Sequence, residues 1–329
     1  MKIKNKKFLT SPSDLNNFVS CKYLIQNEIK FLYKEIKRNE ESIDQKLWKE
    51  FGIKHEKKHF ELLKKYYKKN VSIKQDLSEE ERYKKTLEVI KKGYDLIYHA
   101  YLIDGDFRGE VDFLIRVNKA SDLGDFSYEV YDTKISRKPR PRHIYQITAY
   151  SSMLGKVQGM LPEKMYLIDG ADITHQYKTK EFIDYFLFTK KNLDNFLKNI
   201  NKENIYPEKC EQCNVCDYTD ECEKIWEKDN YINQVAKINR SQIEKLKKVN
   251  ITTVKQLAEA NPDKLKIKIN KQALKDRISQ AQLQEEKRET GVNKYIILDP
   301  DKGKGFYKLP EPDEGDLFFD IEGFPQEDG

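Results

Sequence analysis

The first 95 residues carry hydrophobic positions at helical spacing among many charges. Ser11 is followed directly by Pro12 and, three positions on, by Asp14, a combination typical of a helix N-terminus. Leu15 and Phe18 then continue the helical spacing. This part of the sequence predicts a helical N-terminal segment ahead of any sheet.

The pattern then changes from helical to alternating, which indicates strands. Two β-rich runs within residues 96–117 flank Asp104-Gly105, a dipeptide typical of a hairpin turn. In the second run, the apolar positions Val111, Phe113 and Ile115 are predicted to share one face. Further strands are predicted at 128–136, 164–168 and 173–179, with helices around 144–154 and 182–200. Helices followed by three strands, a helix, strands and a helix predict an α/β sheet domain.

Near the end of the sequence the pattern changes again. Residues 238–260 predict two helices joined at Asn250, which can take the left-handed backbone conformation usually given to glycine. Residues 315–325, GDLFFDIEGFP, predict an apolar strand that carries Asp320 and Glu322. A strand so close to the end leaves little sequence to pack against it, and we expect a truncated chain.

Composition narrows the class of protein without assigning a function. The 329 residues are 38% hydrophobic and 35% charged, and no stretch approaches the roughly 18 apolar residues of a membrane-spanning helix. The N-terminus lacks a secretory signal, so we expect a cytoplasmic protein that does not bind a membrane. The net charge of +6 is too small to indicate a nucleic-acid partner by itself, so that inference depends on local clusters.

An acid and a lysine stand two residues apart at the end of the strand predicted at 128–136. Because side chains alternate along a strand, Asp132 and Lys134 project from one face, and Asp112 of the preceding strand can lie beside them. Carboxylate oxygens bind hard cations, and a lysine can act beside an attacking water, so the set suits a Mg²⁺-dependent phosphodiesterase. A structural ion pair at the strand end is the alternative interpretation.

Basic residues follow directly, where the phosphate backbone of a substrate would have to run. They are Arg137, Lys138, Arg140 and Arg142. On the next helix, Gln146 and Tyr150 are four residues apart, so both can point at the end of the sheet. A solvated loop and an ordinary amphipathic helix are the alternatives.

The series Asp112, Asp132-x-Lys134 and Gln146-x-x-x-Tyr150 resembles the RecB-type branch of the PD-(D/E)xK nuclease superfamily. The resemblance implies a restriction-endonuclease-like fold, with a mixed sheet flanked by helices. It implies that Asp112, Asp132 and the Thr133 carbonyl hold Mg²⁺ or Mn²⁺. Lys134 would position or activate water. Gln146 and Tyr150 would orient the substrate and the site.

That family also has a histidine on an upstream helix, after a glycine, as a further metal ligand. His55 matches it, three residues after Gly52, although this gap is one residue shorter than the commonest form. Glu56, the next residue, could take its place. The resemblance therefore implies a fourth ligand from a helix that precedes the sheet.

The cysteines indicate a metal site, because disulfides are rare in cytoplasmic proteins. One interpretation is a zinc site made by Cys210, Cys213, Cys216 and Cys222. The other, which we favour, follows from a resemblance to iron–sulfur nucleases of the RecB-like group, including the AddB type and CRISPR-associated relatives. These hold a [4Fe–4S] cluster with one cysteine before the nuclease core and a C-x2-C-x5-C set after it. The cysteines that fit are Cys21, Cys213, Cys216 and Cys222.

Two alternative functions remain open. His55-Glu56-x-x-His59 matches H-E-x-x-H, the helix signature of zinc metallopeptidases. Against a peptidase, Lys57 and Lys58 fill the variable positions and would place positive charge beside the cation. The second alternative is a non-catalytic nucleic-acid-binding module held together by its metal.

Residues from about 238 to 322 are similar to a group of RecB family nucleases that continue into an RNase H-like, DnaQ-type exonuclease and sometimes a helicase. In that resemblance Asp320 and Glu322 are the first metal-binding pair of an incomplete second nuclease. The domains implied are a nuclease domain at 1–226, a helix-hairpin-helix-like module at 227–290 and the start of the truncated exonuclease at 291–329. Asn250 stands where glycine is usual in such hairpins.

Together these interpretations predict a metal-dependent DNA nuclease that hydrolyses phosphodiester bonds. The expected substrate is single-stranded or end-bearing DNA, in repair or recombination. Besides DNA, the resemblance implies a helicase or the missing exonuclease portion as a partner.

Overall fold

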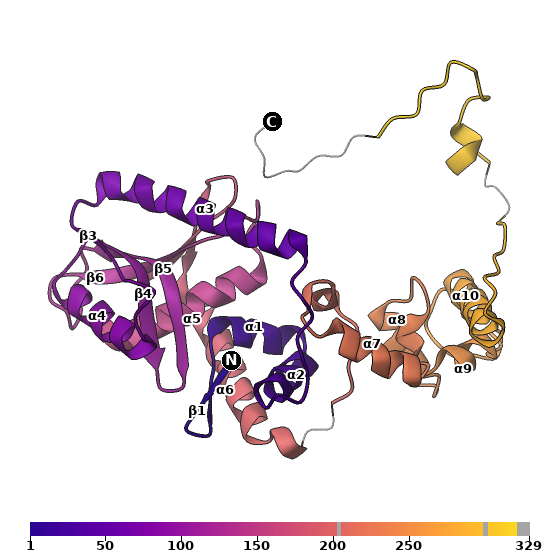
Figure 1. The fold of residues 1–329 in the computed structure, drawn as a ribbon, viewed down its shortest axis with the longest axis horizontal. Coiled ribbons are helices and arrows are strands. Elements are labelled where there is room, and N and C mark those ends of the chain that lie inside the picture. The colour runs from indigo at the N-terminus through magenta and orange to yellow at the C-terminus, as the bar shows by residue number, and fades with distance from the viewer. Residues whose placement is uncertain (203–204, 299–301, 321–329) are drawn as a thin grey trace. The chain divides into compact units, whose positions relative to one another are not determined.

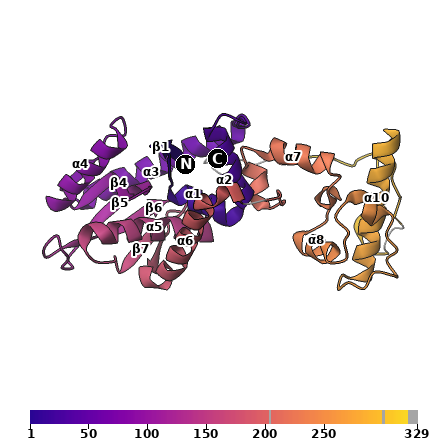
Figure 2. The same cartoon turned by 90° about the horizontal axis from the view of Figure 1, so that it is seen from below.

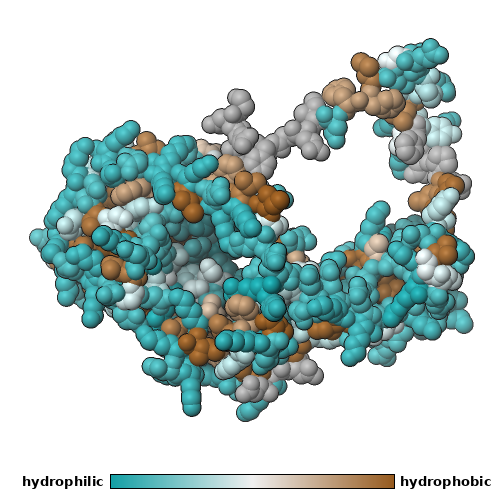
Figure 3. All heavy atoms as spheres, in the orientation of Figure 1, coloured by the Kyte–Doolittle hydropathy of each residue, from teal (hydrophilic) through white to brown (hydrophobic). Residues whose placement is uncertain are grey.

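The computed structural model describes residues 1–202, 205–298 and 302–320. The chain forms two compact units, Met1–Asp220 and Glu221–Gly329, and the first holds the sheet (Figure 1). The face of the first unit seen in Figure 3 is largely hydrophilic, with separate hydrophobic patches. Among the helices of the described residues, none combines the length and apolar character needed to cross a membrane.

A mixed six-stranded sheet with the order β3-β4-β5-β6-β7-β8 forms the centre of the first unit. The strands are β3 (Asn70–Ser72), β4 (Leu96–Asp104), β5 (Phe107–Val117), β6 (Ser127–Thr133), β7 (Lys164–Ile168) and β8 (Thr174–Lys178). The pairs β3–β4 and β6–β7 are parallel, and the other neighbours are antiparallel. This arrangement confirms the predicted α/β class, with a mixed sheet flanked by helices.

Helices cover both faces of this sheet. One large core joins the sheet to α1 (Pro12–Ser20), α2 (Lys22–Leu32), α4 (Glu79–Lys91), α5 (Pro141–Gln158) and α6 (Ile183–Lys198). On the opposite face, α3 (Ile43–Tyr66) packs Phe60 and Leu63 against Tyr98 and Phe113 (Figure 1). Seen from below, α5 and α6 lie close together (Figure 2). The helix α3 therefore packs on the face of the sheet opposite to the large core.

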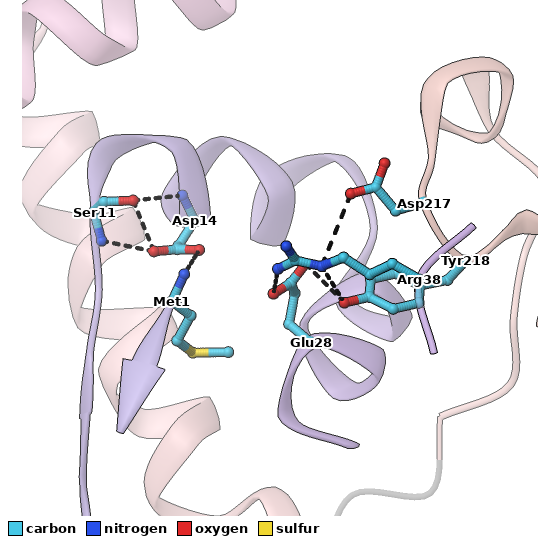
Figure 4. A network of polar contacts seen from close by, with 7 residues as sticks. All are labelled: Met1, Ser11, Asp14, Glu28, Arg38, Asp217 and Tyr218. Carbon is cyan, nitrogen blue, oxygen red and sulfur yellow. Dashed lines mark hydrogen bonds and ion pairs between the residues drawn. The ribbon is translucent and has the colours of Figure 1, made fainter. Parts of the chain in front are cut away.

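The start of the chain is held by a helix cap. The predicted N-terminus of α1 is confirmed, because the Asp14 backbone N–H donates to Ser11 Oγ and the Asp14 carboxylate accepts from the Ser11 N–H at 2.8 Å. The same carboxylate accepts from the Met1 ammonium at 2.9 Å (Figure 4). A small hairpin of β1 (Lys2–Lys4) and β2 (Lys7–Leu9) precedes the helix. These strands are too short to leave a readable alternation in the sequence.

The alternation of side chains changes phase in the middle of the β4–β5 hairpin. Phe113 packs toward α3, whereas Val111 lies in the core on the opposite face, so the prediction that they share a face is wrong. The opposite strand shifts in the same way between Tyr98 and Ala100. His99 lies between these two, with φ of +58°. A left-handed residue in a strand turns the following side chains over, which simple alternation does not anticipate.

The second unit is helical. Its helices are α8 (Arg240–Lys247), α9 (Val254–Ala258) and α10 (Lys271–Thr290), together with most of α7 (Thr219–Lys228). Buried Leu246, Leu257 and Ile278 contribute to its interior. The predicted left-handed joint is confirmed, since Asn250 has φ of +61°. Short 3₁₀ turns complete the described chain at Thr179–Glu181, Ile200–Lys202, Glu211–Val215, Ile232–Gln234 and Gly305–Lys308.

The strand expected at the end of the chain is not formed within its described part. Residues 315–320 make no strand pairing, and Leu317, Phe318 and Phe319 are 89%, 94% and 82% exposed. A strand needs a neighbour for its backbone hydrogen bonds, and none pairs with this segment among the described residues. Residues 321–325 of the predicted strand lie outside the described residues.

Candidate active site

Two aspartates and a lysine meet where β5 and β6 pair. Lys134 Nζ forms an ion pair with Asp132 Oδ2 and donates to the Thr133 carbonyl at 3.0 Å. Asp112 Oδ2 accepts from the backbone N–H and the hydroxyl of Thr133, both at 2.7 Å. Phe113 pairs with Tyr131, and this register aligns the two acidic positions. The structure thus brings together the residues that the sequence analysis singled out.

A third carboxylate, Glu56, comes from α3 on the same side. Its Oε1 lies 2.5 Å from His99 Nε2, and the Tyr98 hydroxyl hydrogen bonds to the same side chain. Burial is the main cause of the raised pKa values of Asp112 and Asp132, and the charge of Glu56 raises both further. Glu56 is therefore electrostatically part of the aspartate cluster.

The charges of this cluster suit a divalent cation. Asp132 is fully buried, and its Oδ1 has no hydrogen-bond partner among the described residues. Burial opposes the charge of Lys134, yet Asp132 and Asp112 raise its pKa, so the amine is a cation among three carboxylates. Carboxylates that outnumber their cations at such a site are costly unless they take up a proton, as the raised pKa values indicate, or bind a further positive charge. Mg²⁺ or Mn²⁺, which prefer oxygen ligands, fit this donor set.

Gln146 and Tyr150 lie together beside the aspartates. Gln146 Nε2 donates to Tyr150 Oη at 3.0 Å. Burial, and after it the charge of Asp132, raise the pKa of Tyr150, so the phenol stays protonated near the acids. Its ring lies over β5 at Gly109, where an added Cβ would be 2.8 Å from Tyr150 Cε1. Gly109 leaves the room for this ring, and the sequence analysis did not single it out.

The four predicted DNA-binding bases lie in and beside the connection from β6 to α5. Arg137, Lys138, Arg140 and Arg142 are all exposed. No acid occurs between Lys134 and Gln146. Burial lowers the pKa of His143 to about 3, and the charges of Lys134, Arg142 and Arg140 add to this effect. The basic residues thus produce a positive potential directly next to the carboxylates.

His55 has different neighbours from Glu56, although the two are adjacent on α3. Its Nδ1 lies 3.8 Å from Asp172 Oδ1, in the connection between β7 and β8. Its ring meets that of His59 edge-on, with centroids 4.6 Å apart. His59 Nε2 in turn lies 2.9 Å from Asp172 Oδ1. Of the two residues considered for the helix-borne ligand, Glu56 is the one that lies with the aspartates.

The cysteines of the first unit gather at the N-terminus of α2. Cys21 precedes that helix, and its thiol hydrogen bonds to Cys210. Cys210 Sγ lies 4.0 Å from Cys213 Sγ. Burial is the main cause of the raised pKa of Cys216, and Cys210 raises it further. Cys222 is buried on α7, in the second unit. Cys210, outside the set favoured for a [4Fe–4S] cluster, is thus the cysteine in contact with Cys21.

A polar network holds the cysteine-rich segment against α2 (Figure 4). The buried Tyr218 donates to Glu28 Oε1 at 3.0 Å, and Arg38 Nη2 donates to Glu28 Oε2 at 2.7 Å. Arg38 Nε also donates to the Tyr218 hydroxyl at 3.0 Å. Nearby, the Asn39 N–H donates to the Asp217 carbonyl at 2.7 Å. These contacts are independent of the thiols.

The pair proposed for a second nuclease is only half described. Asp320 lies in the described chain and is exposed. Glu322 lies outside the described residues. No described contact therefore bears on a joint role for the two.

Some site residues carry no family signal in the sequence. Tyr98 and His99 interrupt a long apolar run, and the one available hint was a histidine inside a buried strand. Asp172 lies in a turn between two predicted strands, where acids are common. Their contacts with α3 are visible only in the folded structure.

The sequence was also compared with known proteins. No protein-family model and no curated protein matches the chain. The family resemblance therefore rests on the motif residues Asp112, Asp132, Lys134, Gln146 and Tyr150 and on the cysteines.

Proposed function

We propose that the protein is a metal-dependent DNA nuclease of the PD-(D/E)xK type, with a restriction-endonuclease-like fold. The observation that carries the proposal is the group of buried Asp132 and half-buried Asp112 and Glu56 around Lys134. In it, the unpartnered Oδ1 of Asp132 is a ready ligand within the described part of the chain. A structural ion pair needs one acid and one base, whereas this group has three acids around one lysine, and one of the acids is fully buried.

Asp112, Asp132 and Glu56 would hold the ion, together with the Thr133 carbonyl. A bound Mg²⁺ or Mn²⁺ supplies Lewis-acid chemistry, lowering the pKa of a bound water and offsetting charge on the scissile phosphate. Lys134 Nζ, held by Asp132 and the Thr133 carbonyl, is positioned to hold the attacking water and to stabilise the developing negative charge. Tyr150 and Gln146 line the site beside them.

The proposed substrate is DNA, single-stranded or with a free end, in repair or recombination. The exposed bases that run on from Lys134 support this choice, because they can neutralise the phosphates on either side of the scissile bond. The preference for ends and the cellular process follow from the family resemblance alone. A helicase or a complete exonuclease as partner has the same basis.

The direct test is a cleavage assay on labelled single- and double-stranded DNA with Mg²⁺ or Mn²⁺, before and after EDTA. We expect cleavage that requires the metal and that Asp132→Asn abolishes. Asp184→Asn, an exposed acid on α6, is the matched control and should cleave like the unaltered protein. Cleavage by Asp132→Asn at the control's rate would contradict the proposal.

A zinc peptidase is the less favoured function. In that chemistry the glutamate of H-E-x-x-H must act beside a metal held by its two histidines. Glu56 is instead engaged by Tyr98 and His99, on the side of the aspartates. A casein assay with Zn²⁺, using Asp132→Asn to exclude the nuclease site, would reveal a peptidase if one were present.

We also propose that the cysteines hold a metal cofactor, a [4Fe–4S] cluster or, alternatively, Zn²⁺. The adjacent thiols of Cys21, Cys210 and Cys213 support a thiolate-bound centre. Anaerobic purification with iron, sulfide and zinc analysis would identify the centre. Comparing Cys210→Ser with Cys222→Ser would then show which of the two cysteines is a ligand.

A further inference from the structure

Two histidines and an aspartate outside the proposed nuclease site converge on one point. His55 and His59 are one turn apart on α3, and both face Asp172 in the β7–β8 connection. One ligand atom from each of the three residues lies within 4.8 Å of the others. Both imidazoles approach the same carboxylate oxygen, Oδ1, at 3.8 and 2.9 Å.

The position of Asp172 is set by its own turn rather than by the histidines. The Asp169 carboxylate accepts from the N–H groups of Ala171 and Ile173, at 2.8 and 3.0 Å. The Asp172 N–H donates to the Asp169 carbonyl at 3.0 Å, with Asp172 in the left-handed region at φ of +62°. A turn organised by Asp169 therefore presents the Asp172 carboxylate to α3 in advance.

The donors are incompletely satisfied. Within the described residues, the buried Nε2 of His55 has no hydrogen-bond partner. Lys58 Nζ lies 2.5 Å from Asp172 Oδ2, the other oxygen of the same carboxylate. An ion between the two rings and Oδ1 would replace the His59–Asp172 contact of 2.9 Å, while Lys58 would compete with the ion only through charge.

We propose that His55, His59 and Asp172 form a second metal site, for a transition metal ion such as Zn²⁺. Two imidazole nitrogens and one carboxylate oxygen are a ligand set typical of zinc. The proposed nuclease site instead offers the carboxylate oxygens of Asp112, Asp132 and Glu56. The site is also distinct from a peptidase centre, because Glu56 is engaged by His99 on another side of α3.

The ion would tie α3 to the segment that enters the basic loop. The β7–β8 connection contacts that segment directly, since the Gly170 N–H donates to the Ser136 carbonyl at 3.0 Å. The Lys134 N–H donates to the Ile168 carbonyl at 2.8 Å, at the end of β7. A metal that fixes Asp172 against α3 therefore steadies the same loop that supports Lys134 and the bases after it.

The test is to count the zinc ions that each full-length chain retains, at saturating Zn²⁺ in the presence of excess Mg²⁺. Because any zinc on the cysteines is common to all variants, only differences are interpreted. We expect Asp172→Asn, which keeps the turn, and His59→Gln each to retain one zinc fewer than the unaltered chain. Asp132→Asn should lose none, and this control separates the second site from the proposed nuclease site.

Lys58→Ala is the opposing variant. If Asp172 serves a metal, removing the competing ammonium should tighten zinc binding about two- to fivefold, as expected for the loss of a partly exposed ion pair. If the cluster only joins α3 to the loop by polar contacts, Lys58→Ala should leave zinc binding unchanged or weaken it. That result, or equal zinc retention by Asp172→Asn and the unaltered chain, would overturn the proposal.

Discussion

One helix, α3, presents two clusters of opposite electrostatic character. Glu56 joins a group in which carboxylates outnumber the single lysine, and one oxygen of Asp132 has no described partner. One residue earlier, His55 joins a group in which one aspartate already has Lys58 and His59 beside it. The first group has an excess of negative charge, whereas the second offers nitrogen ligands around a partly neutralised acid.

The two proposed sites would place different metal preferences on adjacent residues of one helix. Successive side chains on a helix point about 100° apart, so Glu56 faces the sheet strands while His55 faces the β7–β8 connection. Hard oxygen-seeking ions suit the first group and zinc-like ions suit the second. The following predictions test that separation.

The largest effect is expected for Lys134→Ala. Because Lys134 is proposed to act in the transition state, turnover should fall about 10²- to 10³-fold while DNA binding changes little. Single-turnover cleavage and equilibrium binding, measured on the same DNA, separate the two quantities. Equal losses in both would contradict the role assigned to this residue.

The pair Glu56→Gln and His55→Gln tests the comparison most directly. Glu56→Gln should lower turnover about 10- to 100-fold at a fixed Mg²⁺ concentration, with partial recovery at higher Mg²⁺, because a ligand is weakened. His55→Gln should change turnover less than about threefold. If His55→Gln were the more damaging change, the helix ligand would be the histidine that the family resemblance implies, and our assignment would fail.

Gly170→Ala should disturb the contact between the β7–β8 connection and the segment that follows Lys134. An added Cβ would lie 2.1 Å from the Ile135 carbonyl oxygen, so the backbone must move, at a cost of about 1–3 kcal/mol in the free energy of unfolding. Gly52→Ala in α3 is the matched control, since nothing lies within 4 Å of its added Cβ. This control should gain about 0.5–1 kcal/mol from helix propensity. Urea denaturation measures the free energy of unfolding of both variants. A Gly170→Ala variant as stable as the unaltered protein would show that the backbone accommodates the added Cβ.

The smallest effect is expected for Arg140→Ala. Loss of one phosphate contact should weaken DNA binding several-fold and reduce the slope of log K against log salt by about one. Turnover at saturating DNA should stay within about twofold. An unchanged affinity at low salt would exclude Arg140 from the path of the DNA.

Much of the fold could be predicted from the sequence, because it is encoded locally. The cap formed by Ser11 and Asp14, the hairpin of β4 and β5 and the left-handed Asn250 all depend on neighbours a few positions away. The turn lies one residue later than predicted, since the two residues of the loop are Gly105 and Asp106. Simple alternation failed in the middle of this hairpin, where the faces change between Val111 and Phe113 in β5 and around His99 in β4.

The candidate site was harder to predict from the sequence, because part of it is made by contacts between residues far apart in the chain. Asp132 and Lys134 are close in sequence, and their pairing could be anticipated from strand geometry. The choice between His55 and Glu56 could not, since it depends on how α3 is rotated over the sheet. Cys21 and Cys210, far apart in the chain, meet where Tyr218 and Arg38 join the two segments that carry them.

That docking has a consequence for how a cysteine-bound centre would be gained and lost. Glu28, Arg38 and Tyr218 already fix the segment that carries Cys210, Cys213 and Cys216 next to α2, so this ordering is achieved by the chain alone. A centre assembled on such a prearranged set need not supply the free energy of folding that segment. Its removal should leave a folded protein that can be reloaded.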